Sequence, residues 1–197
     1  MEQTNVEHSR EQLAGRKGDW IQTYTGKQFW PIDPRAEDVD ILDIAHALSQ
    51  LCRFTGHSSS FYSVAEHCIA TSYMVPDEDA LWALMHDASE AYLLDLAKPV
   101  KMCKEMSGYR SLEDAVQAVI CDHFSLLKEM PASVKEADLR MLATEVRDVM
   151  GPPPASWGLE DVLPYTMTVK FMQPVNAKRA FLSRFVELTE RQEKNAK

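Results

Sequence analysis

The sequence predicts a mostly α-helical protein, a bundle of about five to seven helices with a short N-terminal β-hairpin. Apolar residues recur at helical spacing along most of the chain. β-branched and aromatic residues gather around a Thr-Gly-Lys turn in the stretch 20–31, which predicts the hairpin. At 197 residues the chain fits one domain, which we expect over residues 20–191, between a polar tail (1–19) and a short C-terminal tail (192–197).

The expected helices are separated by prolines and by glycine- or serine-rich segments. Pro76 and Pro99 interrupt the helical pattern, and the run Gly151-Pro152-Pro153-Pro154 ends it before a connector. Residues 53–60 contain a glycine and three serines, which predicts a loop. The helices are expected to cover roughly residues 41–52, 62–74, 77–96, 109–127, 131–150 and 173–191.

The composition is typical of a soluble globular protein and argues against several kinds of partner. The chain is 45% hydrophobic and 26% charged, with a formal net charge of −9, so we expect no nucleic-acid partner. It has no apolar run of membrane-spanning length and no signal-peptide core, so we expect no membrane partner and a cytoplasmic location. The cysteines form no CxxC pair and are expected to be free thiols: Cys52, Cys68, Cys103 and Cys121.

The stretch from Leu81 to Tyr92 is unusual because it places three ionisable residues in an apolar helical run. Glu90 lies three residues after Asp87 and four after His86, so on a helix all three side chains can converge. No lysine or arginine occurs from Asp77 to Leu96. Burial of these groups costs several kcal/mol without a counter-charge, and a divalent cation is the natural candidate. The alternative is a helix whose acids face water and whose histidine is satisfied in the core.

Two further potential ligands lie on other expected helices. His67 belongs to the preceding helix, and Asp138 is flanked by apolar residues, where an unpaired aspartate would be costly. Two imidazoles and two carboxylates suit Mn, Fe, Co, Ni or Zn better than Mg or Ca. Because adjacent helical residues point about 100° apart, His86 and Asp87 can bind one ion only if they straddle it. The four residues are therefore candidate ligands of one divalent transition metal.

The order of these residues resembles a known family. The HD superfamily of metal-dependent phosphohydrolases, in its 5′-deoxynucleotidase branch, has motifs that resemble Ser63–His67, Met85–Lys101 and Glu136–Asp138. From residue 20 to about residue 185, the chain is similar to the YfdR-like proteins of bacteria and prophages, which lie close to the phage dATP triphosphohydrolases called DatZ. The ordered set is far more specific than a lone His-Asp dipeptide.

The resemblance implies a catalytic metal centre in an HD-domain helical bundle. His67, His86, Asp87 and Asp138 would bind one divalent transition metal and leave positions open for water and a phosphate oxygen. Glu90 would orient or deprotonate the attacking water and would be catalytic together with Asp138. The alternative role of Glu90 is to support a ligating histidine by hydrogen bonding.

The resemblance also implies substrate contacts near residues 53–57. Arg53 would contact phosphate and Phe54 the sugar or base, with core packing as an equal alternative for the ring. His57 lies in the same loop and is a further candidate. Relatives selective for dATP carry an isoleucine near this point, whereas this chain has Thr55-Gly56-His57, so strict adenine selectivity is not expected.

A second group of implied contacts follows the Leu81–Tyr92 stretch. Asp95 would hydrogen-bond the ribose 3′-hydroxyl, and close packing there would favour deoxyribose. Lys101 would bind phosphate, with a solvated lysine at a helix end as the alternative. Lys98, together with Lys104, would serve a longer phosphate chain.

We therefore expect a metal-dependent phosphohydrolase of 2′-deoxynucleotides that forms a homo-oligomer, a dimer or higher, as relatives do. Two reactions stay open: release of phosphate from a dNMP, or of triphosphate from a dNTP, with attack on the 5′-phosphate in both. One alternative is an HD hydrolase of a signalling nucleotide, which would need other recognition residues in place of Asp95. Another is a non-catalytic nucleotide-binding HD module, in which a ligand or Glu90 is usually lost.

Overall fold

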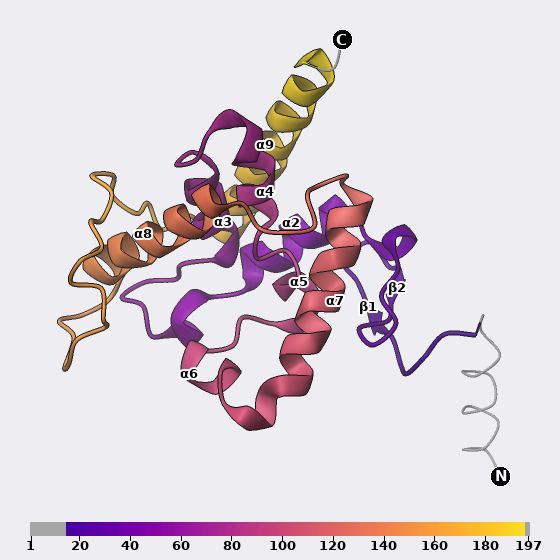
Figure 1. Cartoon of the computed structure of the whole chain (residues 1–197), viewed down its shortest axis with the longest axis horizontal. Helices are drawn as coiled ribbons and strands as arrows, with labels where there is room; N and C mark the ends of the chain where they lie inside the picture. Colours follow the sequence, from indigo (N-terminus) through magenta and orange to yellow (C-terminus); the bar gives the residue numbers. More distant parts are fainter. Residues whose placement is uncertain (1–14, 196–197) are drawn as a thin grey trace.

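The computed structural model describes residues 15–195 and shows a mostly helical bundle with a two-stranded hairpin (Figure 1). Strands β1 (Ile21–Gln22) and β2 (Gln28–Phe29) pair antiparallel, with Ile21 opposite Phe29. The predicted fold class is thereby confirmed. The α-helices are α2 (Ile41–Gln50), α3 (Val64–Ser72), α4 (Ala80–Met85), α5 (Glu90–Leu93), α6 (Lys98–Lys101), α7 (Ser107–His123), α8 (Ala132–Val149) and α9 (Pro174–Asn195).

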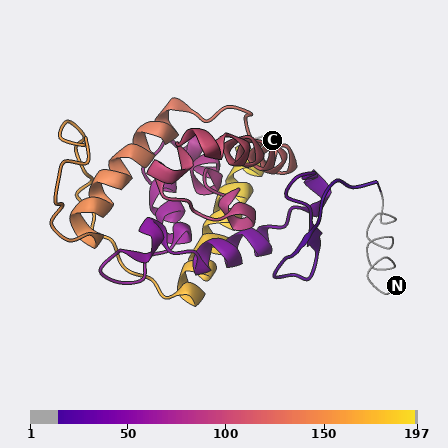
Figure 2. The same ribbon diagram turned by 90° about the horizontal axis from the view of Figure 1, so that it is seen from below.

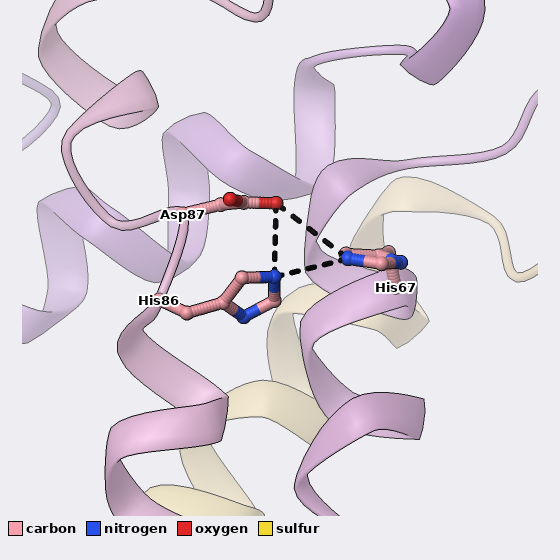
Figure 3. Close-up of side chains that lie close together, drawn as sticks. All are labelled: His67, His86 and Asp87. Atoms are coloured by element: carbon pink, nitrogen blue, oxygen red, sulfur yellow. Dashed lines mark hydrogen bonds and ion pairs between the residues drawn. The ribbon is translucent and has the colours of Figure 1, made fainter. Parts of the chain in front are cut away.

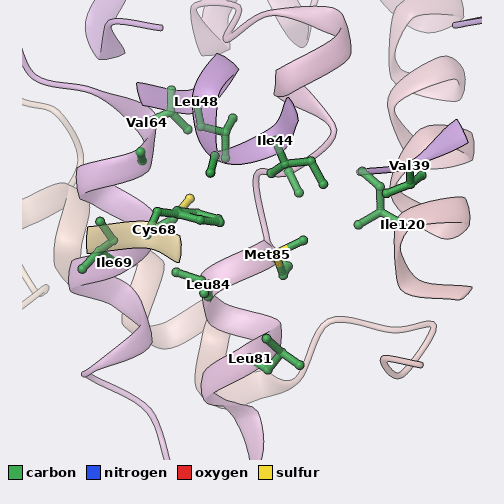
Figure 4. Close-up of a cluster of buried hydrophobic side chains, with 14 of the residues drawn as sticks. Val39, Ile44, Leu48, Val64, Cys68, Ile69, Leu81, Leu84, Met85 and Ile120 are labelled. Atoms are coloured by element: carbon green, nitrogen blue, oxygen red, sulfur yellow. The ribbon is translucent and has the colours of Figure 1, made fainter. Parts of the chain in front are cut away.

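Helix α9 is the element around which the bundle packs. It lies against α2, α3 and α4 and contributes Ala177, Phe181 and Leu188 to the main core. In two perpendicular views the hairpin and α8 lie at opposite ends of the molecule (Figure 1, Figure 2). Within the described residues, every helix is too short or too polar to cross a bilayer. Figure 4 shows the core side chains that the other helices contribute, among them Ile44, Leu48, Val64, Cys68, Ile69, Leu81, Leu84 and Met85.

Side-chain caps define where the first two long helices begin. Asp40 accepts a hydrogen bond from the backbone N–H of Leu42 at 2.9 Å, and Ser63 accepts one from the N–H of Glu66 at 3.2 Å. Such caps satisfy backbone donors that have no partner within the helix. Helix α3 therefore starts at Val64, two residues later than expected, and its first turns carry His67.

The expectation of one continuous helix over residues 77–96 is wrong. Helix α4 ends at Met85, and α5 begins only at Glu90. Between them the backbone forms tight turns, in which the N–H of Ala88 donates to the carbonyl of Met85 at 3.0 Å. The imidazole of His86 bonds the carbonyl of Ala83 at 2.7 Å, and so competes for the acceptor that a continued α-helix would use.

The expected tails differ from the structure at both ends. Arg16 pairs with Asp33 and Asp38 and lies 4.3 Å from the ring centre of Trp30, so ordered contacts begin before residue 20. At the other end, α9 continues to Asn195. Residues 1–14 and 196–197 of the expected tails lie outside the described residues.

The long connection between α8 and α9 is fastened at its C-terminal end by a buried carboxylate. Glu66, the neighbour of His67 on α3, accepts hydrogen bonds from the backbone N–H groups of Lys170 at 2.9 Å and Met172 at 2.6 Å. Arg147 of α8 donates to the carbonyl of Tyr165 at 2.7 Å. The connection is therefore held against the side of the bundle that carries the candidate site.

Candidate metal centre

Three side chains from two separate parts of the sequence meet between α3 and the turn after α4 (Figure 3). Nε2 of His67 lies 3.0 Å from Nε2 of His86. Oδ2 of Asp87 lies 3.6 Å from Nε2 of His67 and 3.3 Å from Nε2 of His86. Each residue offers one ligand atom, and the group could hold a metal ion.

Asp138 of α8 brings a further carboxylate to this group. Its Oδ1 lies 3.1 Å from Nε2 of His67 and 3.8 Å from Nε2 of His86. Burial alone would raise the pKa of Asp138, but hydrogen bonds and charge from the two histidines outweigh burial and lower it. All four predicted ligands thus lie together, although three different segments of the chain supply them.

Hydrogen bonds on the far side of each ring determine which nitrogen faces the cluster. Nδ1 of His86 lies 2.7 Å from the carbonyl oxygen of Ala83, and Nδ1 of His67 lies 2.5 Å from Oε1 of Glu145. A carbonyl and an ionised carboxylate only accept hydrogen bonds, so we assign the hydrogen to Nδ1 in both rings. In the neutral rings, both Nε2 lone pairs then point into the cluster.

This arrangement fits a shared cation. Two lone pairs 3.0 Å apart repel each other unless positive charge lies between them. Metal–nitrogen distances of roughly 2.0–2.1 Å would allow two imidazole nitrogens this close together to bind one ion. Burial lowers the pKa of His86, but the charge of Asp87 and other neighbours outweighs burial and raises the pKa well above its usual value, so the cluster favours a positive charge, either a proton on His86 or a bound cation in its place. The set of two imidazoles and two carboxylates suits a divalent transition metal.

Glu145, two turns after Asp138 on α8, belongs to the site and was not predicted from the sequence. It is fully buried, and besides His67 it accepts hydrogen bonds from the hydroxyl of Tyr62 at 2.8 Å and from Arg53 at 3.0 Å. Burial raises the pKa of Glu145, but Arg53, His67 and the hydrogen bonds lower it to about 2, so the carboxylate is ionised. The seven-residue spacing from Asp138, which places both on one face of α8, was the available signal.

Glu90, the first residue of α5, has a buried and incompletely bonded carboxylate. The residue is only 6% exposed, and its Oε2 has no hydrogen-bond partner among the described residues. Burial and the charges of Asp87 and Asp95 raise the pKa of Glu90 well above its usual value. A buried oxygen of this kind is a place where a water or a ligand donor is expected to bind.

Arg53 approaches the cluster from a 3₁₀ turn at residues 53–56. One terminal nitrogen lies 3.5 Å from Oδ2 of Asp87, and the other is bound to Glu145. Its Nε is buried and has no hydrogen-bond partner within residues 15–195. The guanidinium is therefore held beside a predicted ligand and keeps a donor for an anion.

Phe54 both packs and faces other aromatic groups. Its ring is partly buried against a small core cluster that contains Tyr62 and Val149. The ring of Trp157, from the connection between α8 and α9, lies edge-on at 6.1 Å. The packing that we considered as an alternative role for Phe54 is therefore present.

Asp95 lies in the electrostatic field of the cluster. Burial raises the pKa of its carboxyl group, while Arg53 lowers it and Asp87 raises it. The preceding residue, Leu94, has φ 83° and ψ 153°, and the hydroxyl of Tyr109 donates to its carbonyl at 2.6 Å. A constrained backbone turn thus precedes Asp95, whose carboxyl group interacts with the charges of Arg53 and Asp87.

The remaining predicted contacts are Lys101, Lys98 and His57. Lys101 forms an ion pair with Glu113 of α7. Lys98 and His57 are exposed, and their side chains form no hydrogen bond or ion pair with the part of the chain that the structure describes. Lys101 also interacts electrostatically with Glu90 and Asp87, whereas no hydrogen bond or ion pair among the described residues ties Lys98 or His57 to the cluster.

The fold and the His-His-Asp cluster define a helical protein with a candidate transition-metal centre. No protein-family model matches the chain. The chain is 41% identical over 173 residues to the uncharacterized protein YfdR of Escherichia coli strain K12. The aligned residues cover 87% of this chain and 96% of YfdR. The chain is 30% identical over 186 residues to an uncharacterized protein of Rhodobacter capsulatus, with 85% of this chain and 94% of that protein covered. The chain belongs to the YfdR family.

Proposed function

We propose that this chain is an HD-superfamily, metal-dependent phosphohydrolase of 2′-deoxynucleotides. The observation that carries the proposal is the pair of Nε2 atoms 3.0 Å apart, both assigned as lone-pair donors, with Asp87 and Asp138 beside them. Glu90 interacts electrostatically with Asp87 and adds a buried acceptor, because its Oε2 has no hydrogen-bond partner among the described residues. A cation site with an adjacent base is what hydrolysis of a phosphoester requires.

The proposed reaction uses Glu90 as the base. A divalent transition metal held by His67, His86, Asp87 and Asp138 would polarise the phosphate and lower the pKa of the attacking water. Glu90 accepts the water proton on Oε2. The water oxygen forms a new bond to phosphorus, the bond from phosphorus to the 5′-oxygen breaks, and the 5′-oxygen takes up the proton that Glu90 accepted and leaves as a hydroxyl group.

Charge and hydrogen bonding around the cluster support a nucleotide substrate. Arg53 would offer to a phosphate oxygen its Nε–H, which has no partner in the part of the chain that the structure describes, while Glu145 holds a terminal nitrogen of the guanidinium in place. Asp95 would accept a hydrogen bond from the 3′-hydroxyl of the sugar. Lys101 would reach phosphate after exchanging its ion pair with Glu113.

Product analysis tests the proposal and separates its two forms. Metal-stripped protein, reloaded with Mn²⁺, Co²⁺ or Zn²⁺, is incubated with the four dNMPs and the four dNTPs, and the products are separated by chromatography. Nucleoside with phosphate from dNMPs would define a 5′-deoxynucleotidase, and nucleoside with intact triphosphate from dNTPs a triphosphohydrolase. No nucleoside from either set, with metal bound, would contradict the proposal.

A matched pair of variants accompanies this assay. Glu90→Gln removes the proposed base, whereas Glu105→Gln changes an exposed glutamate on the 3₁₀ turn at 104–106. We expect nucleoside release to be lost in the first variant and kept in the second. Equal activity in both would remove Glu90 from the mechanism.

A further inference from the structure

Glu145 joins two groups that belong to different parts of the proposed mechanism. Its Oε1 bonds Nδ1 of the metal ligand His67 at 2.5 Å, and its Oε2 bonds the anion-binding residue Arg53 at 3.0 Å. The carboxylate is fully buried and has a third donor, the hydroxyl of Tyr62, on Oε1. Neither the metal nor the substrate needs to touch Glu145 for it to affect both.

We propose that Glu145 is the positioning residue of this centre. It fixes the Nδ1–H tautomer of His67, so that Nε2 is presented to the metal, and it holds Arg53 beside Asp87. The metal site and the anion site therefore share one buried anchor. The inference rests on the proposed metal centre, but its tests read metal binding and ring protonation, not nucleotide hydrolysis.

The hydrogen-bond inventory of Glu145 explains why a carboxylate is needed. Three donors converge on it from three segments, so both oxygens must act as acceptors. A glutamine offers one accepting oxygen and one NH₂ group. In Glu145→Gln, either His67 or Arg53 therefore faces a donor instead of an acceptor, and the buried group is left unpaired.

The same geometry gives a control that separates positioning from simple packing. Tyr62→Phe removes one donor to Oε1 but leaves the carboxylate, its charge and its bonds to His67 and Arg53. Tyr62 is as fully buried as Glu145, so loss of its hydroxyl also perturbs the interior. If Glu145 only stabilised the fold, Glu145→Gln and Tyr62→Phe would bind the metal with similar affinity whenever they lose the same amount of stability.

The first test is isothermal titration of metal-stripped wild type, Glu145→Gln and Tyr62→Phe with Mn²⁺ or Co²⁺, beside urea unfolding of each. We expect Glu145→Gln to bind the metal about 10- to 100-fold more weakly, as is usual when a hydrogen-bond partner of a ligating histidine is changed. Tyr62→Phe should bind nearly as tightly as wild type. Equal affinity in the two variants would overturn the inference.

The second test needs no variant and stands if Glu145→Gln fails to fold. In ¹⁵N-histidine NMR of the wild-type protein, without metal and with Zn²⁺, we expect His67 to carry its hydrogen on Nδ1 in both states. On addition of Zn²⁺, the signal of Nε2 should shift. An unprotonated Nδ1, or Zn²⁺ bound through Nδ1, would overturn the inference. Failure of nucleotide hydrolysis alone would leave these results intact.

Discussion

Glu90 lies beside the histidine cluster with one carboxylate oxygen buried and without a hydrogen-bond partner among the described residues. Its neighbours explain this state. Asp87 and Asp95 disfavour its charge, and burial does so most of all, so the pKa is raised well above its usual value. A carboxyl group of this kind exchanges a proton more readily near neutral pH than an ordinary glutamate does. These properties fit the base that we propose Glu90 to be.

Glu90→Gln tests this role. The amide fills nearly the same space but cannot accept a proton, so we expect the rate of nucleoside release to fall about 10²- to 10⁴-fold. Metal affinity should stay near that of wild type, because Glu90 is not among the proposed ligands. The rate is measured by chromatography and the affinity by titration calorimetry. A large loss of metal affinity would show instead that Glu90 supports the ligands.

At the scale of single residues, the sequence was informative about ionisable side chains that lie in apolar stretches. His86, Asp87 and Asp138 were predicted because ionisable residues in apolar helical stretches need compensation, and His67 because it adds an imidazole on the preceding helix in the order typical of the HD superfamily. Glu145 was not, because a glutamate in an amphipathic helix is usually exposed, and only the tertiary contacts with His67 and Arg53 make it otherwise.

Two short elements, the turn after α4 and the helix α5, carry most of the side chains of the candidate site. The turn points His86 and Asp87 at His67, while α5 begins at Glu90 and ends in the backbone bend at Leu94. Leu94 is 59% exposed and has a backbone conformation that side-chain-bearing residues rarely adopt. This strain is maintained next to Asp95, which is a common feature of functional sites.

Leu94→Gly tests the strain directly. The substitution removes little packing, because the side chain is exposed, and it relieves a backbone conformation that costs of order 1–3 kcal/mol. The glycine loses more conformational entropy on folding than leucine does, but this cost is smaller. We therefore expect the free energy of unfolding in urea to rise by about 1 kcal/mol. Leu163→Gly is the control, because Leu163 is 76% exposed and is not among the residues with positive φ. A loss of stability in Leu94→Gly equal to that of the control would contradict the account.

The positions of helices could be predicted, but the break within residues 77–96 could not. Hydrophobic spacing is nearly the same for α-helix and for the tighter turns that replace it over four residues. The break depends on the side chain of His86 taking the carbonyl of Ala83, a contact that periodicity does not report.

On the scale of the whole molecule, one core ties together the elements that bear the ligands. Helices α3 and α4 pack on each other and on α9, and α8 packs on α3. The ligand His67 is fully buried, as is its hydrogen-bond partner Glu145. The geometry of the centre therefore depends on the packing of this core.

Leu84→Ala tests that dependence. Leu84 of α4 is fully buried in the main core, so its truncation should lower the free energy of unfolding by about 2–5 kcal/mol. Leu127→Ala is the control, since Leu127 is 68% exposed and should change stability little. Urea unfolding with an unchanged m-value measures both. A small effect at Leu84 would mean that the core described here does not stabilise the fold.

The measurement that tests the central claim most directly is the metal content of the purified protein. Wild type, His86→Ala and His46→Ala are stripped with a chelator, reloaded with Mn²⁺, Co²⁺ or Zn²⁺, desalted and measured by elemental mass spectrometry. His46 is the control, because it stacks on Tyr24 at 3.8 Å and takes no part in the cluster. The account predicts one ion per chain in wild type and His46→Ala, and almost none in His86→Ala. No retained metal in wild type, or full retention in His86→Ala, would contradict it.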